Sequence, residues 1–177
     1  MDKTAKSYQN GEWIEWIPVG ALYWEGDERI NVTGGWASAS KKTSSSSSIA
    51  AAAPTITRYD DYLYAEQTSS SERNGIIHLN NKIDLTGYST LIAEGEFCFT
   101  ASYSGNCYMG VWTNLGTYTG DNKVAEAEFV NGTETRLEID VSSLEGEHVI
   151  GFVICTNGPD STATKGTYVK LTKLYLK

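Results

Sequence analysis

The residues of this chain with the clearest potential for chemistry are its aromatic side chains, and the chemistry that they suit is ligand binding. The sequence contains five Trp and eleven Tyr, which is more than the core of a small β-sandwich needs. Aromatic rings cover the apolar face of a sugar, while Asn, Asp, Glu or Arg supply hydrogen bonds at its rim. The alternative for each aromatic residue is packing in the core or at a sheet edge. We expect a binding surface around the turn at 104–106 and the loop after it, formed by Tyr103, Asn106, Tyr108, Trp112, Asn114, Tyr118 and Asp121.

The sequence carries no recognisable catalytic or metal-binding pattern. Its two histidines, His78 and His148, lack metal-ligand spacing, and there is no nucleophile elbow, phosphate-binding loop or paired-cysteine motif. A glycosidase needs two carboxylates that face each other across a pocket. The acidic candidates instead alternate along predicted strands, where solvation explains them; they include Glu94, Glu96, Glu126 and Glu128. We therefore expect no enzymatic activity, no cofactor and no metal.

The three cysteines, Cys98, Cys107 and Cys155, are an odd number. If the turn at 104–105 closes a two-residue hairpin, Cys98 faces about Val111 and Cys107 faces about Ser102. The two thiols would then lie roughly 13 Å apart along the ladder, too far for a disulfide, whose Cα atoms lie within about 7 Å. We expect all three cysteines to be reduced.

Length and charge restrict the fold and the partners. At 177 residues the chain is long enough for one domain with a real core. A net charge of −8 and the absence of a Lys/Arg cluster argue against nucleic acid or an anionic membrane surface as the partner. No apolar run is long enough to span a bilayer, and residues 1–13 lack the apolar region of a secretory signal.

Period-two alternation of apolar and polar residues predicts strands along most of the chain. The strand at 90–103 is the longest, with Leu91, Ala93 and Phe97 on one face, and we expect it to be central. Asn131-Gly132 predicts a hairpin between 123–130 and 135–141, whose inward residues are Thr135, Leu137, Ile139 and Val141. Residues 148–156 are almost wholly apolar, as expected of a strand that is buried on both faces. Further strands are predicted at 62–66, 74–79, 107–113 and 166–176.

These patterns predict an all-β fold, an antiparallel two-sheet β-sandwich of jelly-roll type, over residues 20–177. Trp36, after a Gly-Gly pair, is expected to close one end of its core. Residues 41–53 are rich in Ser and Ala and are predicted to be a surface loop. Residues 1–19 precede the sandwich as an aromatic ribbon or linker, with a hairpin turn at Asn10-Gly11.

Several segments together resemble a domain of tail and tail-fibre (receptor-binding) proteins from phages and prophages of gut Firmicutes. They are LYWEGDERINVTGGW with the Ser-rich stretch after it, NKIDLTGYSTL, VSSLEGEHVIGF and the closing VKLTKLYLK. The opening KSYQNGEWIEW resembles short segments that often lie upstream of that domain. The layout is also similar to carbohydrate-binding jelly rolls, which often hold a structural calcium through an acidic residue in the closing strand. Here residues 171–174 read Leu-Thr-Lys-Leu, with no such acid.

The resemblance implies a C-terminal domain of a tail protein that recognises a cell-surface glycan of the bacterial host. Its partners would be that glycan and other virion tail proteins, and its location would be the virion tail or an extracellular surface. The alternative is a purely structural fibre tip or spacer. In that case the N-terminal ribbon would mediate assembly, since fibre proteins tend to be homotrimers.

Overall fold

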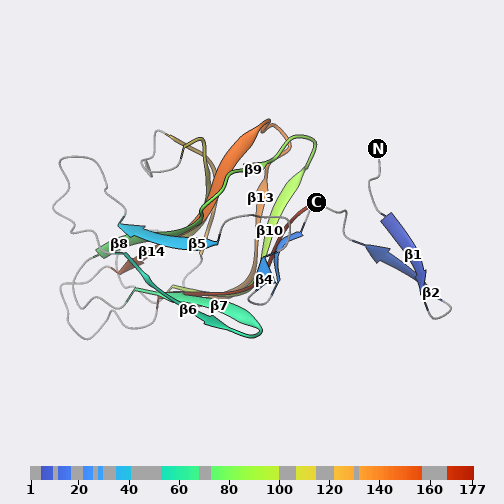
Figure 1. Cartoon of the computed structure of the whole chain (residues 1–177). Helices are drawn as coiled ribbons and strands as arrows, with labels where there is room; N and C mark the ends of the chain where they lie inside the picture. Colours follow the sequence, from blue (N-terminus) through green and yellow to red (C-terminus); the bar gives the residue numbers. More distant parts are fainter. Residues whose placement is uncertain are drawn as a thin grey trace.

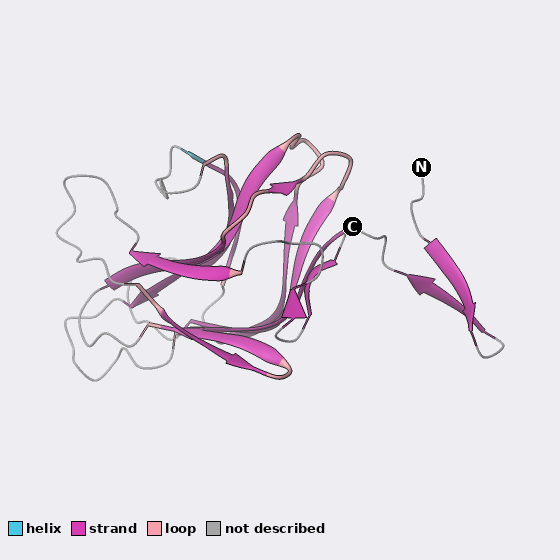
Figure 2. Ribbon diagram, viewed as in Figure 1, coloured by secondary structure: helices cyan, strands magenta, loops and turns pink. Residues whose placement is uncertain are grey.

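The computed structural model consists of strands and connecting turns (Figures 1 and 2). It describes residues 5–9, 12–16, 22–25, 28–29, 35–40, 53–67, 73–99, 107–114, 122–129, 132–156 and 167–177. Every strand pairing within this part of the chain is antiparallel. The predicted all-β, two-sheet antiparallel sandwich is confirmed, while its jelly-roll connectivity stays a prediction.

One layer of the sandwich is a seven-stranded sheet in the order β13-β10-β15-β3-β4, with β7 also paired to β15 and β6 to β7. Its strands are β3 (Leu22–Glu25), β4 (Glu28–Arg29), β6 (Thr55–Tyr59), β7 (Tyr62–Glu66), β10 (Thr90–Phe99), β13 (Gly132–Asp140) and β15 (Tyr168–Leu176). The predicted long strand at 90–103 is thus described over 90–99 and has a partner on each side, which confirms its interior position.

The other layer is a six-stranded sheet in the order β12-β11-β14-β8-β5, with β9 paired to β14. Its strands are β5 (Trp36–Ser40), β8 (Arg73–Leu79), β9 (Ile83–Asp84), β11 (Tyr108–Trp112), β12 (Lys123–Glu128) and β14 (Glu147–Thr156). Residues 148–154 of β14 are all buried, as predicted for a strand covered on both faces.

The core lies between the two sheets and is filled by their inward-facing side chains. Phe97 of β10 stacks on Phe152 of β14 with ring centroids 5.6 Å apart, and Trp36 packs on the same Phe152 at 5.6 Å. Leu91 and Ala93 are fully buried beside Phe97, as the alternation predicted. Full burial of side chains of this size stabilises the fold by about 1.5–3 kcal/mol each, so this contact layer holds the two sheets together.

Two predicted hairpins are wrong, because their strands belong to different sheets. β10 and β11 do not pair: β10 pairs with β13 and β15, whereas β11 pairs with β12 and β14. β12 and β13, the strands predicted to pair across Asn131-Gly132, likewise belong to different sheets. An Asn-Gly pair favours a tight turn locally, but pairing is decided by burial. Leu137 and Ile139 become buried opposite Ala93 and Leu91 of β10.

The predicted register between the strands of Cys98 and Cys107 depended on the first of those hairpins and is therefore wrong as well. Cys98 lies in the seven-stranded sheet, opposite Tyr168, while Cys107 directly precedes β11 of the other sheet. Both are buried free thiols. The side chain of Cys155 lies outside the described residues.

Smaller differences concern an edge strand and one side chain. β6 was not predicted, although it pairs with β7 through the turn at Asp60-Asp61. Thr135, expected to face inward, is exposed, whereas Leu137, Ile139 and Val141 are buried. The predicted loop at 41–53 lies outside the described residues except for Ala53.

The N-terminal ribbon is a two-stranded sheet of its own, made of β1 (Ala5–Gln9) and β2 (Glu12–Trp16) (Figure 1). Its register places Tyr8 opposite Trp13 and Gln9 opposite Glu12. This pairing agrees with the predicted hairpin, although the Asn10-Gly11 turn itself is outside the described residues.

Candidate functional site: a tyrosine-rich sheet face

Of the aromatic residues singled out from the sequence, the two that the structure describes are buried. Trp112 is 0 % exposed and Tyr108 is 6 % exposed, and their ring centroids lie 6.2 Å apart on β11. The indole of Trp112 lies over Gly110, because a Cβ added there would come within 2.5 Å of the ring. Neither ring presents a free face to a sugar, so the expected role of Tyr108 and Trp112 in ligand stacking is corrected to packing.

The remaining predicted site residues are not brought together by the described structure. Asn114 follows β11 and is exposed. Tyr103, Asn106, Tyr118 and Asp121 lie outside the described residues.

A different surface combines aromatic and polar residues in the way that was expected around the turn at 104–106. On β7 and β15, the inward residues Leu63, Ala65, Val169 and Leu171 are fully buried. Alternation therefore turns the residues between them outward. The outer side of these strands and their neighbours carries five tyrosines, which we call the tyrosine face: Tyr59, Tyr62, Tyr64, Tyr168 and Tyr175.

The tyrosine rings on this face contact one another across neighbouring strands. Tyr59 of β6 stacks on Tyr62 of β7 with centroids 4.5 Å apart and planes at 27°. Tyr64 of β7 packs against Tyr168 of β15 at 5.4 Å. The Nζ atom of Lys170, which pairs with Tyr64 in the ladder, lies 4.3 Å above the Tyr62 ring. These two ring pairs, which we call the aromatic strip, lie on β6, β7 and β15, and Tyr59 at the outer edge is 44 % exposed.

Carboxylates fix the phenol groups of three of these tyrosines. The hydroxyl of Tyr64 donates to Glu66 at 3.2 Å, that of Tyr175 donates to Glu94 at 2.8 Å, and that of Tyr168 donates to Glu96. Each glutamate therefore holds one ring in a defined orientation. The rings are positioned before any ligand arrives, which lowers the entropy cost of binding.

The same environment raises the pKa of the phenols. Partial burial, with the nearby charge of Glu66, raises the pKa of Tyr64 to about 12. The hydrogen bond to Glu96, together with burial, raises the pKa of Tyr168. Burial and the hydrogen bond to Glu94 raise the pKa of Tyr175, although Arg136 opposes the shift. All three phenols therefore remain hydrogen-bond donors at neutral pH.

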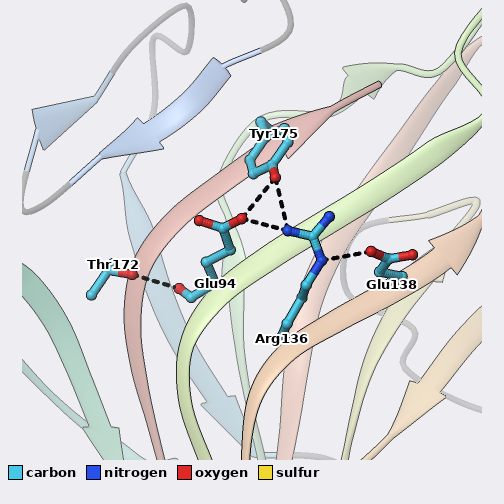
Figure 3. A network of polar contacts seen from close by, with 5 residues as sticks. All are labelled: Glu94, Arg136, Glu138, Thr172 and Tyr175. Carbon is cyan, nitrogen blue, oxygen red and sulfur yellow. Dashed lines mark hydrogen bonds and ion pairs between the residues drawn. The ribbon is translucent and has the colours of Figure 1, made fainter.

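Beyond Tyr175 the face continues into an ion-pair network on β10, β13 and β15 (Figure 3). Arg136 donates through Nη1 to Glu94 at 2.6 Å and to the Tyr175 oxygen at 3.2 Å, and through Nε to Glu138 at 2.6 Å. The Thr172 hydroxyl donates to the backbone carbonyl of Glu94 at 2.9 Å. The Arg136 side chain is 43 % exposed, so the network forms a polar margin that remains open to solvent.

The separate strands of this surface, but not their proximity, can be predicted from the sequence. The segment Tyr62-Leu-Tyr-Ala-Glu66 alternates aromatic and apolar residues, and Tyr168 and Lys170 alternate with Val169 and Leu171 in the same way. The pattern indicates a strand with one aromatic, polar face. What the sequence did not show is that β7 and β15 are neighbours, which depends on a pairing between segments about a hundred residues apart.

The two histidines of the chain make short-range hydrogen bonds to backbone carbonyls. The Nδ1 atom of His78 donates to the carbonyl of Leu79 at 2.9 Å, and that of His148 donates to the carbonyl of Gly146 at 3.0 Å. Within the described residues, no group of three or more His, Cys, Asp or Glu side chains could hold a metal ion. No helix within them is long and apolar enough to cross a membrane.

The comparisons with known proteins returned nothing: no family model, no curated protein and no solved structure matches the chain. Ordered aromatic rings bounded by carboxylates and a guanidinium suit an extended ligand that has both apolar C–H surfaces and many hydroxyl groups.

Proposed function

We propose that this chain is a glycan-binding domain and that the tyrosine face is its binding surface. The observation that supports the proposal is the group of five tyrosines on one sheet face, three of them oriented by hydrogen bonds to glutamates. Sugars present hydroxyl groups at their edges and C–H groups on their faces. Phenol rings and carboxylates on this surface match both kinds of group.

The extent of the face favours an oligosaccharide over a single sugar. Tyr168 and Tyr175 lie seven residues apart on β15, which at a rise of about 3.3 Å per residue corresponds to roughly 20 Å of strand. A chain of several sugars could contact the Tyr59–Tyr62 pair at one end and the Arg136 network at the other. Tyr and Arg are also the residue types that most often dominate binding energy at interfaces.

The biological setting that we propose follows the sequence resemblance. Segments such as LYWEGDERINVTGGW and VSSLEGEHVIGF resemble a domain of phage and prophage tail proteins. In that setting the domain would be displayed on the virion tail and would bind a glycan on the surface of the bacterial host. The acidic, two-sheet sandwich and its outward-facing tyrosines support this proposal.

The test is a glycan array and host-cell binding with the wild type and three single variants. Tyr59→Ala removes the most exposed ring of the face, and we expect it to weaken glycan binding by about 2 kcal/mol, roughly thirtyfold. Its unfolding free energy should change by about 0.5 kcal/mol or less, because the ring is 44 % exposed. Val124→Ala is the matched control, since Val124 is 42 % exposed but lies on β12 of the other sheet.

Trp112→Ala is the third variant, and it tests whether Trp112 is a packing residue rather than a ligand-binding residue. Because Trp112 is fully buried, we expect a loss of about 3–5 kcal/mol in unfolding free energy. A wild type that binds neither glycans nor cells, together with trimers in a sizing measurement, would favour the structural fibre tip over the binding domain.

A further inference from the structure

The charges and hydrogen bonds of the tyrosine face indicate which chemical class of glycan it would bind. This inference rests on the proposed function. Three of the five phenol protons of the face, those of Tyr64, Tyr175 and Tyr168, are already donated to Glu66, Glu94 and Glu96. The surface therefore offers a ligand mainly acceptors, namely the remaining lone pairs of carboxylate and phenol oxygens. A ligand rich in donors is the complementary partner.

The arrangement of charges points the same way. Four carboxylates on the strands of the face contact its tyrosines or Arg136, and two exposed aspartates occupy the β6–β7 turn beside Tyr59. Together these six acids outnumber the basic side chains described on the same strands, which are Arg58, Arg136, Lys170 and Lys173. The four carboxylates belong to Glu66, Glu94, Glu96 and Glu138, and the aspartates are Asp60 and Asp61.

The strongest cation of the face is already engaged by its own carboxylates. Arg136 donates through two different nitrogens, to Glu94 and to Glu138. A guanidinium recognises an acidic ligand through the same forked donors. An acidic glycan that approached this guanidinium would lie beside Glu94 and Glu138 and would be repelled by them as a like charge.

An ammonium group, in contrast, has a demonstrated place on this surface. The Nζ atom of Lys170 lies 4.3 Å above the ring of Tyr62, within the distance at which a cation is attracted to an aromatic face. The ammonium of an amino sugar could occupy equivalent positions over the other rings, where Glu66 and Glu96 lie close by.

From this geometry we infer that the tyrosine face binds glycans that carry free amino groups, such as de-N-acetylated amino sugars, in preference to neutral ones, and rejects acidic ones. The aromatic strip contacts the sugar faces, and the surrounding carboxylates pair with the protonated amines.

The experiment compares three oligosaccharides of equal length by calorimetry, at a pH where sugar amines are protonated. The probes are fully de-N-acetylated chitooligosaccharide, its N-acetylated form and oligogalacturonate. We expect the amine form to bind about two- to fivefold more tightly than the neutral form for each amine–carboxylate pair made. This advantage should shrink in high salt, because exposed pairs are screened. The galacturonate should not bind.

The double variant Glu66→Gln/Glu96→Gln assigns the preference to the face. Each Gln can still accept the phenol hydrogen bond, so the rings of Tyr64 and Tyr168 keep their orientation while two negative charges are removed. We expect the double variant to lose its preference for the amine form, so that its affinities for the amine and the neutral probe become equal. Glu145→Gln, on the exposed β13–β14 turn, is the control and should keep that preference.

The outcomes separate the two proposals. If the neutral probe binds but the amine form binds no more tightly, or the double variant keeps the preference, the inference about amino groups is wrong and glycan binding stands. If the wild type binds none of these probes and nothing on a glycan array, glycan binding itself is wrong, and this inference fails with it.

Discussion

At the scale of single residues, the tyrosine face depends on the coupling of each phenol to a neighbouring acid. A tyrosine on a strand can adopt several rotamers, and each unfixed ring loses conformational entropy when a ligand immobilises it. The hydrogen bonds from Tyr64, Tyr168 and Tyr175 to glutamates restrict that freedom in advance. They also link the stability of the fold to the protonation of the phenols.

The first prediction concerns this linkage. The pKa of Tyr64 is raised to about 12, whereas a phenol in the unfolded chain has a pKa of about 10. Above pH 10 the unfolded state therefore binds fewer protons than the folded state, and the unfolding free energy falls as pH rises. The contribution of Tyr64 is fully present below pH 10 and is lost as pH approaches about 12.

Urea denaturation at several pH values between 8 and 11 measures the effect. We expect the unfolding free energy of Tyr64→Phe to decline less steeply above pH 10 than that of the wild type, because its phenol no longer titrates. Equal slopes in the two proteins would show that the environment of Tyr64 does not raise its pKa.

At the scale of elements, the sequence predicted strands well and their partners poorly. Alternation located the long strand at 90–99 and the buried strand at 148–154, because burial of one or both faces depends on the strand's own residues. The pairings of β12 with β13 and of β10 with β11 were predicted from the turn residues between them, which report only on local structure. The structure places the members of each pair in opposite sheets.

The candidate site illustrates the same limit. Tyr62 and Tyr168 are outward residues of strands that could be predicted separately, yet their proximity follows from the pairing of β7 with β15. The binding surface was predicted instead at aromatic residues near the loops. Two of these, Tyr108 and Trp112, belong to a strand whose residues are buried. A count of aromatics therefore indicated that a binding surface could exist, but only the sheet order placed it.

The second prediction concerns the backbone where β10 meets β15. Gly95 has φ +155°, and a Cβ there would lie 2.0 Å from the backbone oxygen of Lys170. The pairing with β15 also shifts register between Glu94 and Gly95. Gly146 offers a contrast, because its φ is +78° and a Cβ would have no atom within 4 Å.

Gly146→Ala should therefore cost only the dihedral strain, about 1–2 kcal/mol. Gly95→Ala should cost more than about 3 kcal/mol, because the strain is joined by a clash that moves the β15 backbone. Because Glu94 and Glu96 flank Gly95, the same change should also reduce glycan binding. Chemical denaturation of both variants provides the comparison, and equal losses would mean that β15 can shift without cost.

At the scale of the whole molecule, the ribbon and the sandwich are separate sheets. β1 and β2 pair with each other, and neither takes part in the strand order of the two larger sheets. A single two-stranded hairpin is marginally stable in water. Such a ribbon gains stability when it packs against another surface, either on the same chain or on a second copy.

The last prediction concerns removal of residues 1–19, which distinguishes packing of the ribbon on its own chain from packing on a second copy. If the sandwich is an independent unit, its unfolding free energy should change by about 0.5 kcal/mol or less, and glycan binding through the tyrosine face should persist. If the ribbon joins copies of the chain, the truncated protein should be monomeric in a sizing measurement in which the full chain is a trimer. A truncated sandwich that unfolds at clearly lower urea concentration would show instead that the ribbon packs on the sandwich of its own chain, and the boundary at residue 20 would then be wrong.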